Sequence, residues 1–189
     1  MEKLIRLLQK YGTGKVVSLL LIVTMAVYLT MLLYTIPAVI AFAPDMMLFD
    51  LLPTGYTPEY AASLLAALGA EGRATYLTLQ LPLDFLYPGL FAITYSLLLT
   101  WLFSKAAVAD SKIFYFSLVP ILTGLFDYIE NGFIVLLLRS YPDISSSIVE
   151  LASFFTLLKS GFSTVFFILL FWGLVRFIKK KNSIAQAKS

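Results

Sequence analysis

The segment IFYFSLVPILTGLFDYIENGFIVLLL, residues 113–138, is apolar over almost its whole length and carries a small polar group near its middle. A helix needs about 20 apolar residues to cross the hydrocarbon core of a bilayer, so this segment predicts a membrane-spanning helix. Three other segments have comparable length and composition: residues 16–42, 76–103 and 148–175. The expected fold is an all-α integral membrane protein, an antiparallel four-transmembrane-helix bundle with a long, partly helical external loop at residues 43–75.

The overall composition supports a membrane protein. The chain has 189 residues, of which 60% are hydrophobic and 13% are charged, and its mean hydropathy is +0.89. A soluble domain has about 25% charged residues. A chain this apolar cannot hide its side chains in one water-soluble core of this size, so we interpret residues 1–189 as a single membrane domain.

The distribution of charge predicts the orientation of the bundle. Lysine and arginine are frequent before the first span and in the tail at residues 176–189, and Lys105 and Lys112 with Asp110 occupy the second loop. The loop between the first two spans instead carries Asp45, Asp50, Glu59 and Glu71, with Arg73 as its single basic residue. Because basic loops stay on the cytoplasmic side, we expect both termini to be cytoplasmic and the protein to lie in the cell (inner) membrane.

The chain start, MEKLIRLLQKYGTGK, sets Leu4, Ile5, Leu7 and Leu8 beside basic residues. This pattern is typical of a short amphipathic helix on an anionic membrane surface. An ordinary positively charged flank of the first span would have a similar composition, and both interpretations stay open.

The external loop has the sequence signals of a helix. Thr57 suits an N-cap, Pro58 suits the first helical position, and Gly69 suits the stop after Leu68. We expect residues 57–68 to form a helix that covers the mouth of the bundle above Asp84, either as a structural lid or as a gate over a cavity. Further along, Pro82 and Pro88 predict kinks in the second span.

The polar group in the third span is the principal candidate site. Asp127, Glu130 and Asn131 are three and four residues apart, so they share one face of a helix. Ionisable groups in hydrocarbon are costly and normally face the interior of a bundle, where they need partners. At 1.5 Å per residue, Asp127 lies about 16 Å below the outer end of its span, and Lys159 lies at a similar depth on the fourth span. We therefore expect Lys159 to contact Asp127 or Glu130.

Asp84 is the sole acid of the second span, and its depth depends on where that helix begins. A start near residue 74 places it inside the membrane, whereas a start at Pro82 places it at the interface. The candidate catalytic residues are Asp127, Glu130 and Lys159. The candidate ligand-binding residues are Asp84, Asn131, Arg73, Tyr87, Tyr28, Thr123 and Ser163.

The clustered acids outnumber the lysine, so not all of these groups are charged at once. A shared proton, a neutral carboxyl group, Arg73 reaching into the cluster or a bound cation would each restore the balance. The chain has neither cysteine nor histidine, which excludes disulfides, haem and Fe–S ligation by these residues, the common zinc sites and every mechanism that needs histidine. No cofactor or metal ligand set is expected, and an all-oxygen cation site stays open.

These observations favour a binding or catalytic site for a lipid-like or small polar ligand in the outer half of the bundle. Two alternatives stay open: a structural or accessory subunit whose polar cluster only stabilises the bundle, and a proton- or cation-conducting transporter. Whether the protein is an enzyme is not decided by the sequence. The expected partners are membrane lipids and a lipid-like or small-molecule ligand, without nucleic acid, and a membrane protein partner or a homo-oligomer stays open.

Overall fold

The computed structural model describes residues 1–106 and 111–186, and within these ranges the regular structure is entirely helical. Four helical segments are long and apolar enough to cross a membrane: Gly14–Ile40, Pro58–Lys105, Lys112–Ser140 and Ser146–Ser183. The predictions of an all-helical chain and of four long apolar helices are therefore confirmed. Asp110 of the second loop and residues 187–189 of the predicted tail lie outside the described residues.

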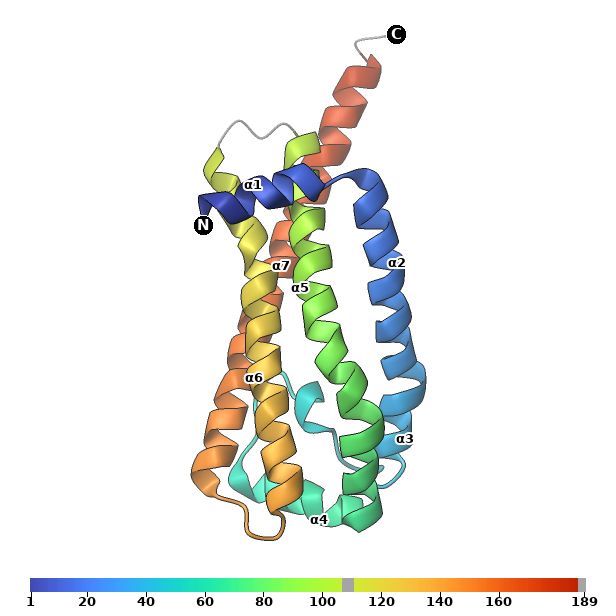
Figure 1. Ribbon diagram of the computed structural model, residues 1–189, viewed down its shortest axis with the longest axis vertical. Helices are drawn as coiled ribbons and strands as arrows, with labels where there is room; N and C mark the ends of the chain where they lie inside the picture. Colours follow the sequence, from blue (N-terminus) through green and yellow to red (C-terminus); the bar gives the residue numbers. More distant parts are fainter. Residues whose placement is uncertain (107–110, 187–189) are drawn as a thin grey trace.

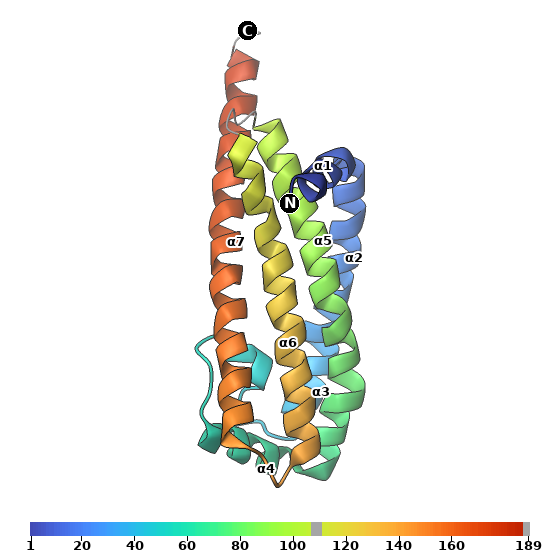
Figure 2. The same ribbon diagram turned by 60° about the vertical axis from the view of Figure 1, so that its left-hand side comes forward.

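The four long segments run side by side and alternate in direction (Figures 1 and 2). Their main helices are α2 (Gly14–Thr30), α5 (Leu81–Lys105), α6 (Val119–Ser140) and α7 (Ser146–Gln186). α5 packs against the other three, and α6 also packs against α7. Residue 1 and the last turns of α7 lie at one end of the bundle, called the terminal end below, and the opposite end is called the loop end (Figure 1).

Two of the long segments contain a π-helical turn directly before a proline. The turn Met31–Thr35 joins α2 to α3 (Ile36–Ile40), whose second residue is Pro37, and the turn Tyr76–Gln80 leads into α5, whose second residue is Pro82. Proline has no backbone N–H and cannot donate the usual helical hydrogen bond. The extra residue of a π turn lets the helix continue past the missing hydrogen bond. The two turns contact each other, and the buried Thr35 hydroxyl donates a hydrogen bond to the Gln80 side-chain oxygen.

Helix α4 (Pro58–Thr75) lies across the loop end (Figure 1). The Thr57 hydroxyl caps it by accepting from the Tyr60 N–H at 3.2 Å, and its apolar side chains Ala61, Leu64, Leu65 and Leu68 are buried. Gly69 has φ +62° and ψ −177°, which turns the chain before it continues as helix. The predicted helix at residues 57–68, its cap and the glycine break are confirmed.

The segment between α3 and α4 folds into the loop end of the bundle. It contains a short 3-10 helix, η2 (Phe49–Leu51), which contacts α6, and both Leu48 and Phe49 are fully buried. The Tyr60 hydroxyl of α4 donates to the Met47 carbonyl at 2.8 Å and accepts from the Met47 N–H at 2.9 Å. These contacts fix the position of the intervening Asp50.

At the terminal end, α1 (Glu2–Tyr11) crosses the bundle and contacts α5 (Figure 1). Ile5 and Leu8 are buried against the protein, whereas Leu4 and Leu7 are exposed. The predicted helix is therefore present, and only part of its apolar surface is used in packing within the chain.

Helices α5 and α6 approach closely at Gly124. A Cβ atom at this position would lie 2.6 Å from the Pro88 carbonyl oxygen of α5, which is closer than a side chain allows. Pro88 itself lies inside α5, which continues through it. The close approach brings the next turn of α6, with Asp127, against α5.

Candidate functional site

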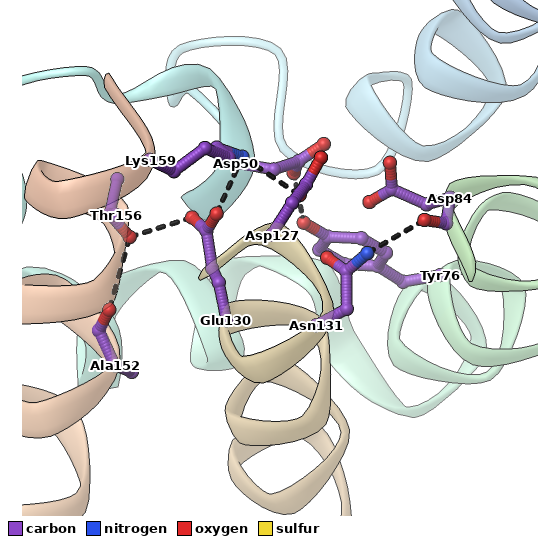
Figure 3. A network of polar contacts seen from close by, with 9 residues as sticks. All are labelled: Asp50, Tyr76, Asp84, Asp127, Glu130, Asn131, Ala152, Thr156 and Lys159. Atoms are coloured by element: carbon purple, nitrogen blue, oxygen red, sulfur yellow. Dashed lines mark hydrogen bonds and ion pairs between the residues drawn. The ribbon is translucent and has the colours of Figure 1, made fainter. Parts of the chain in front are cut away.

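The centre of the candidate site is a buried ion triad between α6 and α7. The Lys159 ammonium nitrogen lies 3.2 Å from Asp127 Oδ1 and 2.5 Å from Glu130 Oε2 (Figure 3). The first contact is also a hydrogen bond, and the second is an ion pair without hydrogen-bond angles. The predicted contact between Lys159 and these acids is confirmed, because the three-residue spacing places both acids on the face of α6 that meets α7.

Glu130 is the most deeply placed member of the triad. Its side chain is fully buried, and its Oε1 atom accepts a hydrogen bond from the Thr156 hydroxyl at 2.6 Å. Thr156 lies three residues before Lys159, so both reach Glu130 from one face of α7. Glu130 therefore anchors α6 to α7 behind the more accessible Asp127.

Asn131 connects α6 to α5. Its Nδ2 atom donates a 2.7 Å hydrogen bond to the backbone carbonyl of Asp84, and both residues are buried (Figure 3). The Asp84 side chain is not used in this contact, and its Oδ2 atom has no hydrogen-bond partner among residues 1–106 and 111–186. Figure 3 shows the Asp84 carboxyl group directed toward Asp127. A buried acceptor in this position is available to a ligand.

Asp50 joins the cluster from the predicted external loop, and Tyr76 joins it from the first residue of the predicted second span. The fully buried Tyr76 hydroxyl donates a hydrogen bond to Asp50 Oδ1 (Figure 3). The signal that could have identified Asp50 is its isolation in the apolar stretch MMLFDLL, residues 46–52, where a solvated loop would carry more polar residues. As one of several charges in a predicted external loop, Asp50 bears only on the predicted orientation.

Tyr56 fastens the Asp50-bearing segment to α7. Its backbone N–H donates to Ser153 Oγ at 2.8 Å, and its ring lies 4.7 Å from that of Phe49, measured between centroids. Burial raises the pKa of the Tyr56 phenol above its usual range, and the Glu130 carboxylate raises it further. The phenol therefore remains protonated at the loop end of the cluster.

Asp50, Asp84, Asp127 and Lys159 line a cavity of ≈430 Å³, whose walls come from α2, the turn Met31–Thr35, α3, η2, α5, α6 and α7. Its polar wall consists of Asp50, Asp84, Thr123, Asp127, Lys159 and Ser163. Its apolar and aromatic wall consists of Met25, Tyr28, Met31, Ile36, Leu51, Tyr87, Phe91, Tyr95 and Phe167. The cavity is thus amphipathic, because acidic groups and aromatic rings both line it.

Most of the residues proposed from the sequence meet at this cavity. Tyr28, Asp84, Tyr87, Thr123, Asp127, Lys159 and Ser163 line it, and Glu130 and Asn131 lie in the hydrogen-bonded network behind the wall. Arg73 is held away from it. Its guanidinium donates to the Leu65 carbonyl at 2.6 Å and stacks over the Tyr141 ring, with 4.2 Å to the centroid.

The charges of the cluster are unbalanced. Asp50, Asp84, Asp127 and Glu130 provide acidic groups, and Lys159 is the one basic residue among the described residues that line the cavity. Within residues 1–106 and 111–186, no group of three acids is arranged to hold a metal ion. Chemically, the arrangement can accept hydrogen bonds, bind a positive charge, or exchange protons with a bound molecule.

Comparison with known protein families, with curated proteins and with solved structures finds no match for this chain. The chemistry of the cavity therefore carries the functional argument.

Proposed function

We propose that this protein is an integral membrane protein of the cell (inner) membrane, with four spans and both termini in the cytoplasm. The long helices expose large apolar side chains that water would not favour, among them Leu19, Ile22 and Leu33 on the first segment and Phe167, Ile168 and Phe171 on α7. Contiguous apolar surface of this kind suits contact with lipid. The basic residues that precede the first span and follow the last lie at the terminal end, which supports its cytoplasmic placement.

Within this membrane protein, the cavity is a binding site for a lipid-like ligand. The observation that carries this proposal is the amphipathic lining, in which Asp84, Asp127 and Lys159 face the same space as Tyr87 and Phe91. Its volume of ≈430 Å³ lies within the range of about 300–1,000 Å³ that small-molecule pockets occupy. A scaffold that only holds helices together would be expected to close this space with side chains.

The surface next to the cavity suits an alkyl chain. An apolar hollow of ≈610 Å³ runs along α7, lined by Thr164, Phe167, Ile168, Phe171, Trp172 and Val175. Phe167 lines both this hollow and the cavity. From Phe167 to Val175 a helix rises about 12 Å, which is enough for the tail of a small amphiphile whose head group occupies the cavity.

Conduction of protons or cations receives less support. From the cavity to the terminal end, the described parts of α2, α5, α6 and α7 carry no aspartate or glutamate. The polar side chains buried in that half include Thr24, whose hydroxyl shares a 2.7 Å hydrogen bond with Thr94. The acidic relay residues that mark many proton paths through membranes are therefore missing from the described part of this half.

Native mass spectrometry of the purified protein, released from a nonionic detergent, tests ligand binding. The probes are dodecylamine, dodecanol and dodecanoate, which share one tail length and differ in the head group. We expect saturable binding of at least one probe, and loss of that binding in Ser163→Phe, which fills the cavity from α7. Ser147→Phe, at an exposed position near the start of the same helix, is the matched control and keeps binding.

Absence of saturable binding for all three probes, or equal binding in the cavity-filling variant and the wild type, would refute the proposed function.

A further inference from the structure

We infer that the head group of the ligand is cationic, a protonated amine or a quaternary ammonium, held by the carboxylates of Asp84 and Asp50 and the rings of Tyr28 and Tyr87. This inference rests on the proposed function and names the class of ligand that the same cavity would take. It follows from the charges left unpaired in the cavity, from one orphaned buried oxygen and from the placement of the aromatic rings.

Lys159, the one basic residue among the described residues that line the cavity, is already paired with acids. Lys159 contacts both Asp127 and Glu130, at 3.2 and 2.5 Å, and an ammonium has three N–H donors. Glu130 receives a further hydrogen bond from Thr156. Two acids therefore balance the charge of Lys159, and the triad offers no net positive charge to an anionic ligand.

Asp84 supplies the most direct evidence for a ligand. Its side chain lines the cavity, the residue is 4% exposed, and Oδ2 has no partner within residues 1–106 and 111–186. A buried polar atom without a hydrogen bond is costly, and the cost is larger for a charged group. A ligand N–H directed at this oxygen would remove that cost, and a positive charge on the nitrogen would strengthen the bond.

Asp50 places a second carboxyl group at the same cavity, and its hydroxyl partner Tyr76 carries no charge. An anionic head group would meet Asp50, Asp84 and Asp127 in a space of low polarity. Like charges at close range are unfavourable there, so the electrostatics of the wall select against carboxylates, phosphates and sulfates.

The aromatic wall complements a cation. The Tyr28 and Tyr87 rings lie 5.7 Å apart and the Tyr87 and Phe91 rings 5.9 Å apart, between centroids, and all three side chains line the cavity. Ring faces attract ammonium groups, with the largest effect where water is excluded. Since no three acids among the described residues are arranged for a metal ion, an organic cation with an apolar tail fits the cavity better than a bare ion.

The head-group series described above tests the inference on the wild-type protein. Charge-assisted hydrogen bonds contribute more than neutral ones, so we expect dodecylamine to bind at least about tenfold more tightly than dodecanol, with dodecanoate the weakest. If dodecanol or dodecanoate binds as tightly as dodecylamine and Ser163→Phe removes that binding, the cationic head group is refuted while the proposed function stands. If no probe shows binding that Ser163→Phe removes, the proposed function fails.

Asp84→Asn tests the assignment of the orphaned oxygen, because it removes the charge with almost no change of volume. We expect it to reduce the preference for dodecylamine over dodecanol by about tenfold. Glu71→Gln removes an acid from the exposed surface of the loop end, outside the cavity, and is expected to leave the preference unchanged. An unchanged preference in Asp84→Asn overturns the role of Asp84. If this variant does not fold, the order of the three probes on the wild type decides the inference alone.

Discussion

Removal of the Lys159 ammonium is the most informative perturbation of the fold, because two acids depend on it. At an effective dielectric constant of about 20, attraction across 3.2 Å amounts to about 5 kcal/mol and across 2.5 Å to about 7 kcal/mol, and desolvation offsets most of this. Breaking a buried pair by deleting one partner costs about 3–5 kcal/mol. We expect Lys159→Met to lower the free energy of unfolding by that amount.

Glu130 and Asp127 are expected to contribute unequally to the free energy of unfolding. Glu130→Gln keeps an acceptor for the Thr156 hydroxyl and leaves Lys159 paired with Asp127, so it should cost about 1–3 kcal/mol. In the double variant Lys159→Met/Glu130→Gln, only Asp127 remains without its partner, and it faces the cavity. The double variant should therefore be about 1–3 kcal/mol more stable than the sum of the single effects predicts.

Reversible unfolding by sodium dodecyl sulfate in mixed micelles, followed by far-ultraviolet circular dichroism, measures these four proteins. Lys179→Met, which removes an exposed lysine from α7, is the matched control and should change the free energy of unfolding by less than about 0.5 kcal/mol. If the effects of the two single substitutions sum to the effect of the double variant within about 0.5 kcal/mol, energetic coupling between Lys159 and Glu130 is refuted.

Three further predictions concern topology and backbone packing. A membrane-impermeant maleimide applied to intact cells should label Asp143→Cys and leave Ser183→Cys unlabelled, and the reverse result contradicts cytoplasmic termini. Gly124→Ala should lower the free energy of unfolding by about 1–3 kcal/mol, because its Cβ would meet the α5 backbone, whereas Gly132→Ala, with open space around it, should be neutral or stabilising. Gly69→Ala should cost about 1–2 kcal/mol in the same assay, because φ is +62° there, and an unchanged stability would argue against a constrained turn.

The local structure was largely predictable because it depends on neighbours in sequence. The length of the apolar runs predicted the four long helices, and the capping pattern of Thr57 and Pro58 predicted the start of α4. Helical spacing placed Asp127 and Glu130 on one face, and equal depth on adjacent antiparallel helices predicted their contact with Lys159. The depth of a residue in the membrane can be calculated from its position along the helix, because the rise per residue is constant.

Contacts between segments that lie far apart in the sequence are not predicted by such arguments. Arg73 was proposed for the site, yet its guanidinium stacks on Tyr141 instead, a contact between residues far apart in sequence. Asp50 was assigned to an external loop, whereas its segment is buried against α6 and its carboxyl group reaches the cavity. Loop conformation depends on which apolar side chains find space in the bundle, and sequence periodicity carries no information about that.

The sequence by itself determined an apolar all-helical chain, the absence of histidine and cysteine chemistry, and a polar face on the third long helix, since composition and helical spacing are local properties. Only the tertiary structure decided which groups share the cavity and which oxygen of Asp84 lacks a partner. These features arise where α5, α6, α7 and the segment before α4 meet. Their geometry is set by packing and hydrogen bonding between segments that the sequence separates, so it appears only when the chain is folded.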